Sequence, residues 1–192
     1  MSAGTETRRQ AGQHARAQAK RLGWLRFLGG SFKRDFGAWS QGAEGEEVVG
    51  KILEGLAADG WHVIHDVSFG RANIDHIVVG PGGIFTVETK SHRGKIFLDN
   101  VDQRMLGQAY AEKRKLEEIT GMEVQALLVF SQAYLVGRVP AKRRGVLIVP
   151  ARMLADFFAG RRPVMSVEEA AVIYSRLALA VGQTPSLSQA PV

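Results

Sequence analysis

The stretch "NIDHIVVGPGGIFTVETK" (residues 73–90) decides the fold of this chain. Two apolar runs flank the turn-forming segment Gly-Pro-Gly-Gly (80–83), which is typical of a β-hairpin. Charged side chains are depleted in strands, and burying a charge is costly unless it is paired or coordinated. These two runs nevertheless carry Asp75, Glu88 and Lys90. This conflict indicates a functional site at the open end of the hairpin.

The register of the hairpin brings the two acids together. A symmetric hairpin pairs Val79 with Ile84 and so places Asp75 opposite Glu88, whereas a three-residue loop would break this register. Directly opposed residues have Cβ atoms about 5 Å apart, so one carboxyl must be protonated or a cation must lie between them. We do not expect Lys90 to neutralise the pair alone, because it lies two residues farther along. A hard divalent cation such as Mg²⁺ is the natural partner. The alternative is a structural Asp–Lys pair with Glu88 at a sheet edge.

A helix is expected to begin near Gly42 and to end before Gly60. Its apolar residues recur at helical spacing: Val49, Ile52, Leu53 and Leu56. Glu46 lies about 60° from Val49 around this helix, at the edge of the apolar stripe. Gly42 and Gly45 share the stripe, so both are expected to allow a close approach to the packed neighbour.

The remaining segments predict an α/β fold. Strands are expected at 61–69, 73–79, 84–90, 95–99, 124–130 and 146–149, and helices at 103–119, 151–159 and 166–181. The early strands are tightly joined and therefore antiparallel, while the helix at 103–119 allows a parallel crossover. On that helix Gln108 lies beside a stripe made of Met105, Ala109, Glu112 and Leu116. The sequence thus predicts a mixed sheet flanked by helices.

Positive charge is concentrated at the N-terminus. Of the 192 residues, the first 40 hold eight basic and two acidic side chains, which accounts for the whole net charge of +6. We therefore expect a basic, partly disordered arm (1–40), a folded domain (41–182) and a flexible tail (183–192). A basic arm suggests nucleic acid or an anionic membrane as partner. The candidate phosphate-binding residues are Arg16, Lys20, Arg21, Arg26, Lys33 and Arg34 of the arm and Lys142, Arg143 and Arg144 of an expected basic loop (137–145).

The composition also bounds the compartment and the chemistry. The chain has no cysteine, which excludes disulfides and cysteine-ligated zinc and fits a reducing cytoplasm. The apolar runs are far shorter than a membrane span, and no signal peptide is visible. His62 and His65 are three apart in a strand and should point to opposite faces, which is poor geometry for one metal. His76 should point away from Asp75 for the same reason.

Three segments resemble the nuclease-related domain (NERD) family of the PD-(D/E)xK nuclease superfamily. They are "GAEGEEVVGKIL" (42–53), "NIDHIVVGPGGIFTVETKSHRGKI" (73–96) and "GQAYAEKRKL" (107–116). The resemblance implies a restriction-endonuclease-like core and hydrolysis of phosphodiester bonds that depends on Mg²⁺ or Mn²⁺, with DNA as the expected substrate. It matches Asp75 and Glu88 to the metal-binding acids, Lys90 to the motif lysine and Glu46 to the acid of the first helix. Gln108 matches the glutamine of the second core helix. The carbonyl of Thr89 is expected to complete the ligands of the metal, and Glu46 is expected to hold a second metal or its water shell.

Two rival functions remain open at this stage. One is a non-catalytic nucleic-acid-binding module on a nuclease fold. The other is a membrane-surface or scaffold protein that uses Trp24, Phe27 and Phe32 with the basic arm as an interfacial anchor. The sequence leaves open DNA versus RNA, endo- versus exonuclease action, strand preference and oligomeric state.

Overall fold

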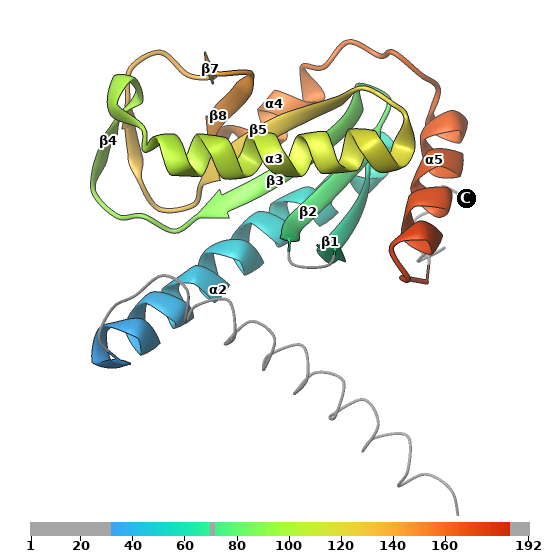
Figure 1. Ribbon diagram of the computed structural model, residues 1–192. Helices are drawn as coiled ribbons and strands as arrows, with labels where there is room; N and C mark the ends of the chain where they lie inside the picture. Colours follow the sequence, from blue (N-terminus) through green and yellow to red (C-terminus); the bar gives the residue numbers. More distant parts are fainter. Residues whose placement is uncertain (1–31, 70–71, 185–192) are drawn as a thin grey trace, which may run out of the picture. The chain divides into compact units, whose positions relative to one another are not determined.

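The computed structural model describes residues 32–69 and 72–184 (Figure 1). The chain divides into two compact units, Met1–Ser40 and Gln41–Val192. The strands are β1 (His62–Phe69), β2 (Ala72–Gly80), β3 (Gly83–Lys90), β4 (Lys95–Phe97), β5 (Val124–Phe130), β6 (Tyr134–Val136), β7 (Ala141–Arg143) and β8 (Val146–Pro150). The helices are α2 (Phe32–Glu54), α3 (Gln103–Thr120), α4 (Leu154–Ala159) and α5 (Val167–Ala180), with short 3-10 helices at Gly55–Asp59, Leu98–Asn100 and Ala151–Met153.

The second unit is built on one mixed sheet, so the predicted α/β fold is confirmed. Six strands lie in the order β1-β2-β3-β5-β8-β7. The strands β1, β2 and β3 form an antiparallel meander, whereas β3, β5 and β8 run parallel. The parallel step from β3 to β5 passes through α3, as expected for a crossover that needs a helix.

Three sequence-based boundaries are wrong. The helix expected to begin near Gly42 already includes Phe32, since interior glycines cost only about 1 kcal/mol each and do not by themselves end a helix. The segment 137–145, expected to be a loop, contains β7, which pairs antiparallel with β8. The segment expected as a strand at 95–99 leaves the main sheet: β4 pairs in parallel with β6 in a separate two-stranded sheet.

The hairpin register is confirmed. Val79 pairs with Ile84, and the ladder continues to the pair His76–Val87. Gly83 has a φ of 117°, a conformation that residues with a side chain rarely adopt. The tight turn therefore depends on glycine at this position and sets the register of both strands.

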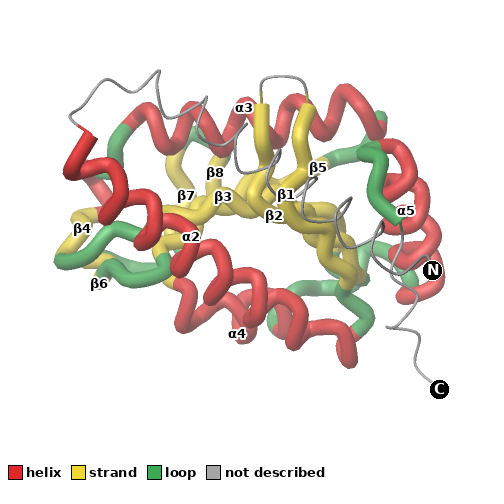
Figure 2. The backbone as a smooth tube through the Cα atoms, turned by 90° about the horizontal axis from the view of Figure 1, so that it is seen from below, coloured by secondary structure: helices red, strands yellow, loops and turns green. Residues whose placement is uncertain are grey.

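Helices cover both faces of the sheet (Figure 2). On one face, Leu53 of α2 and Phe158 of α4 belong to a buried cluster with Val78 of β2. On the opposite face, Leu116 of α3 and Leu177 of α5 are buried against the sheet. Each large apolar side chain buried in this way contributes about 1.5–3 kcal/mol. These two cores fix α2 and α3 on opposite sides of the sheet that carries Asp75 on β2 and Glu88 on β3.

Within the described residues, no helix combines the length and the apolar character that crossing a membrane requires.

Candidate active site

The candidate site begins where the pairing of β2 with β3 ends. Beyond the pair His76–Val87 the backbone ladder stops, and the side chain of Asp75 takes its place. The backbone N–H of Thr89 donates a hydrogen bond to Asp75 Oδ2 over 2.8 Å. Asp75 and Glu88 are both buried, and the charge of Glu88 acts on Asp75. The structure thus brings together the two acids that the register placed opposite each other.

Lys90 is directly paired with Glu88. Its Nζ donates to Glu88 Oε1 and, over 3.1 Å, to Gln108 Oε1. Lys90 therefore pairs with one of the two acids, Glu88, although it lies two residues farther along the strand. Two residues on the same face of a strand lie only about 7 Å apart, and the flexible lysine side chain folds back across that distance. Gln108 lies on α3, so the lysine links the strand to the helix.

Glu112 is a member of this cluster that the sequence did not assign to it. It is buried on α3, and its Oε1 accepts a hydrogen bond from Gln108 Nε2 over 3.1 Å. Burial, followed by the charge of Glu88 and a hydrogen bond to it, raises the pKa of Glu112 to about 11. Glu112 therefore keeps its proton at neutral pH and can donate it to Glu88. In the sequence, the signal that could have assigned Glu112 to the cluster is the position of an acid on the apolar stripe of a helix.

The cluster holds more acid than its one lysine can neutralise. Burial first, and then the charges of Glu88 and Glu46, raise the pKa of Asp75 well above its usual range, although the Thr89 N–H and Lys90 oppose this. Burial lowers the pKa of Lys90, but the charge of Glu88 and the hydrogen bond to it outweigh burial, and the pKa rises. Lys90 is therefore charged while Asp75 resists ionisation. The charges of Glu88 and Glu46 contribute to this shift after burial, and the negative potential that they create favours a bound cation.

Glu46 reaches the cluster because α2 approaches the strand ends closely. A Cβ on Gly45 would lie 2.6 Å from Ser131 Oγ and 2.7 Å from Ser91 Cβ, and these serines directly follow β5 and β3. The close approach expected at Gly45 is confirmed. The one expected at Gly42 is wrong, since a Cβ there would meet nothing within 4 Å.

The residues present fit a divalent cation held by few protein ligands. Asp75 and Glu88 offer buried carboxylate oxygens. Within the described part of the chain, Glu88 Oε2 accepts no hydrogen bond from an N–H group or a hydroxyl, so the proton of Glu112 is the donor available to Glu88. In a strand the N–H and C=O of one residue point to the same side, so the Thr89 carbonyl is directed like its N–H, toward Asp75. No group of three or more His, Asp or Glu side chains is arranged to hold a metal in residues 32–69 and 72–184. The charge of Glu46 acts on Asp75 from the α2 side of the cluster.

The predicted phosphate-binding residues fall into three groups. Arg16, Lys20, Arg21 and Arg26 lie outside the described residues. Lys33 and Arg34 belong to α2, where only the backbone is described. Lys142 and Arg143 lie in β7, and Arg144 forms the following turn with a φ of 48°.

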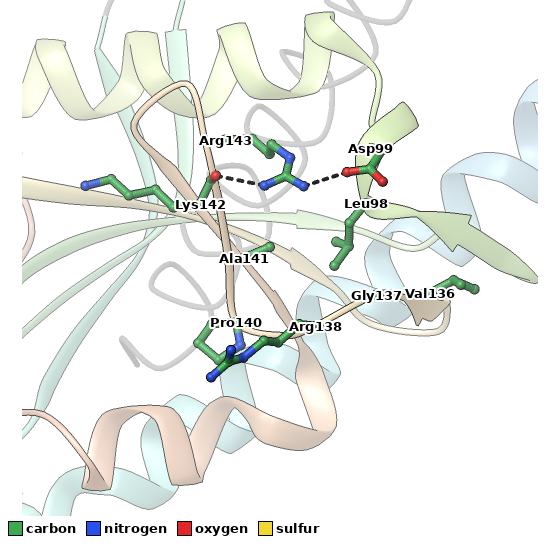
Figure 3. A pocket seen from close by; sticks show the side chains of 9 residues that line it. All are labelled: Leu98, Asp99, Val136, Gly137, Arg138, Pro140, Ala141, Lys142 and Arg143. Carbon is green, nitrogen blue, oxygen red and sulfur yellow. Dashed lines mark hydrogen bonds and ion pairs between the residues drawn. The ribbon is translucent and has the colours of Figure 1, made fainter.

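A shallow basic pocket lies at β7 (Figure 3). It has a volume of about 360 Å³ and is lined by Arg138, Lys142 and Arg143 among other residues. Arg143 Nη2 lies 2.7 Å from Asp99 Oδ1, so the charge of this arginine is partly neutralised. Lys142 and Arg138 are therefore the cations of this pocket that are more available to an anionic ligand.

His62 and His65 lie on opposite faces of the sheet and His76 lies on the face opposite to Asp75, as the strand alternation predicted. His62 stacks on Tyr174 of α5, with ring centroids 4.8 Å apart. His65 lies on the other face, where its Nδ1 is 2.8 Å from Nδ1 of His76. His65 and His76 share the face that α2 covers, opposite to Asp75.

Comparisons with known proteins relate part of this chain to a described family. Residues 41–131 match the family model described as nuclease-related domain. This range contains every residue of the cluster from Glu46 to Glu112. An uncharacterized protein of Bacillus anthracis is 37% identical over 62 residues, which are 30% of this chain and 29% of that protein. The chain thus spans less than a third of the length of that relative. No solved structure gives a significant match.

Proposed function

We propose that this chain, which contains a nuclease-related domain and so belongs to that family, is a metal-dependent nuclease that hydrolyses phosphodiester bonds in DNA. One observation carries the proposal. The buried acids Asp75 and Glu88 meet Lys90 at the end of β3, where a sheet interior would otherwise be apolar. A purely structural ion pair would need one acid, whereas this cluster also contains the buried acid Glu112.

Asp75 and Glu88 would hold Mg²⁺ or Mn²⁺ together with the backbone carbonyl of Thr89. A hard cation with one or two carboxylates and several waters is the usual arrangement for Mg²⁺ at phosphate-processing sites. When bound, such a metal supplies a water of lowered pKa and a positive charge beside the phosphate. Glu46, at the edge of the cluster, would accept hydrogen bonds from the waters on the α2 side.

Lys90 would orient the attacking water or stabilise the negative charge that develops on the phosphate. Its Nζ has Gln108 Oε1 as a second partner at 3.1 Å, which would still hold the lysine if Glu88 turned to a cation. Gln108 is a positioning residue, because its amide nitrogen is fixed by Glu112 and its amide oxygen therefore faces the lysine. The protonated state of Glu112 supports this chain of contacts without adding another negative charge.

Sequence-independent contacts to the DNA backbone would come from the basic residues of the arm and from Lys142. Such phosphate contacts position a substrate but do not read its sequence. The absence of cysteine and the DNA substrate fit action in the cytoplasm.

The test is cleavage of labelled single- and double-stranded DNA, with RNA in parallel, in Mg²⁺, Mn²⁺ or EDTA. Asp75→Asn and Glu88→Gln should each abolish metal-dependent cleavage while the fold remains intact. Lys90→Met should retain metal binding by calorimetry but lose turnover. Asp59→Asn removes an exposed acid by the same chemical change and should cleave like the wild type.

Two outcomes would contradict the proposal. If Asp75→Asn cleaves like the wild type, the site is misassigned. If the wild-type protein binds DNA but cuts no nucleic acid with either metal, the domain is a non-catalytic binding module.

A further inference from the structure

The two-stranded sheet β4–β6 has an inner and an outer face. Ile96 and Leu135 point inward and pack with the core on the α3 side of the main sheet. Because register partners in a parallel pair share a face, the other face carries Lys95 with Tyr134 and Phe97 with Val136. These four residues make up the outer face of β4–β6. Tyr134 is 59% exposed and Phe97 56% exposed, which is unusual for aromatic side chains in a sheet.

Basic groups accompany the two rings. The guanidinium of Arg152 lies 5.8 Å from the centroid of the Tyr134 ring, close enough for a cation–π interaction. Lys95 lies on the same face, and the outer face of β4–β6 contains no acid. Core interface residues of protein–protein contacts are depleted in lysine, whereas a positive groove with aromatic platforms is the usual arrangement for binding single-stranded nucleic acid. The charge therefore favours a polyanion over a second protein surface.

The outer face of β4–β6 is also tied to the candidate active site. Strand β4 begins five residues after Lys90, and the N–H of Tyr134 donates to the carbonyl of Gly94 over 2.8 Å. Ser131, which leads into β6, donates its N–H to the carbonyl of Lys90 over 3.0 Å. The seven residues from Lys90 to Phe97 span at most about 24 Å, which bounds the distance between this face and the candidate active site.

We propose that the outer face of β4–β6 stacks unpaired bases of a single-stranded substrate within about 24 Å of the scissile phosphate. The nature of the ligand rests on the proposed nuclease function. Phe97 and Tyr134 are diagonal neighbours, about 8 Å apart from the strand spacing and the rise per residue. Each ring is therefore free to stack a separate base. Lys95 and Arg152 contact the adjoining phosphates.

Binding in EDTA, where no turnover occurs, tests this proposal. The probes are a fluorescein-labelled 12-nucleotide oligothymidine, an abasic phosphodiester strand of equal length and a 12-base-pair duplex, read by fluorescence anisotropy. Tyr134→Ala and Phe97→Ala should each raise the Kd for oligothymidine about 5- to 150-fold, the range found when one base–aromatic stack is lost. The Kd values for the abasic strand and the duplex should change less than twofold. Tyr134→Phe should bind like the wild type, and so should Tyr110→Ala, which removes an exposed aromatic on α3.

The remaining outcomes decide against the proposal. Unchanged binding of oligothymidine by both alanine variants would overturn it, and so would an equal loss for the abasic strand, which would show that the rings hold no base. A wild-type self-association that both variants lose, with DNA binding unchanged, would assign the face to a second copy of the chain. If Tyr134→Ala unfolds β4–β6, Tyr134→Thr provides the same test with a good strand former. A wild type that binds oligothymidine through these rings but cuts no DNA would refute the proposed function and leave this inference standing.

Discussion

Replacing Glu112 by glutamine should stabilise the metal-free protein, although Glu112 is buried in the candidate site. The folded state keeps Glu112 protonated because burial, the charge of Glu88 and the hydrogen bond to it raise its pKa to about 11 from a usual value of 4.5. In the unfolded chain the same carboxyl loses its proton near its usual value. Between these two pKa values the unfolded state therefore binds fewer protons, and the free energy of unfolding falls as the pH rises. Glutamine does not titrate, and its NH₂ group can donate to Glu88 as the acidic proton does.

The magnitude follows from the width of this pH window. Each pH unit costs about 1.4 kcal/mol, so Glu112 lowers the free energy of unfolding at pH 7 by about 3 kcal/mol relative to pH 4.5. This figure requires only that the folded-state pKa lies above 7. Glu112→Gln should thus be close to the wild type at pH 4.5 and more stable by up to about 3 kcal/mol at pH 7, with a difference that widens at higher pH.

Urea unfolding in EDTA at half-unit steps from pH 4.5 to 8 measures this difference, provided that the m-value stays constant. Glu118→Gln is the matched control, because Glu118 lies on the same helix with a 59% exposed side chain. Its effect should stay within about 0.5 kcal/mol at every pH. A Glu112→Gln variant whose stability relative to the wild type does not change with pH would show that Glu112 is ionised in the folded protein, and the proposed proton between Glu112 and Glu88 would be refuted.

Two further predictions concern α2 and β1. Gly45→Ala should lower the free energy of unfolding by about 1–3 kcal/mol through overpacking against Ser91 and Ser131. Gly42→Ala should raise the free energy of unfolding by about 0.5–1 kcal/mol, because its added Cβ would meet no atom within 4 Å. Equal effects of the two variants in urea unfolding would contradict the close approach of α2. Burial lowers the pKa of His62, so its contribution to stability is present above pH 6.5 and is lost as the pH falls below 6.5. His62→Phe should reduce the loss of Tm between pH 7.5 and 5 in thermal melts, and an acid sensitivity equal to that of the wild type would argue against a neutral buried histidine.

Much of the fold follows from local patterns. The turn at 80–83 and the strict alternation on either side of it determine that Asp75 and Glu88 approach each other, because a period of two leaves one choice of face for each residue. The helical spacing of apolar residues on α3 likewise determines that Gln108 faces the sheet. The same spacing on α2 directs Glu47 to solvent, where it pairs with Lys51. These features need only the chain's own geometry over a few residues.

Several of the parts that the sequence missed depend on contacts between distant segments. Glu112 joins the site only because α3 packs over β3, and Lys90 finds Gln108 for the same reason. Strand β4 leaves the main sheet because its partner β6 lies almost forty residues later, a pairing that no local periodicity encodes. The sequence by itself therefore determined which acids meet on the hairpin. The tertiary structure decided which groups neutralise them, since charge pairing and proton sharing depend on distances and burial that arise only when the helices pack on the sheet.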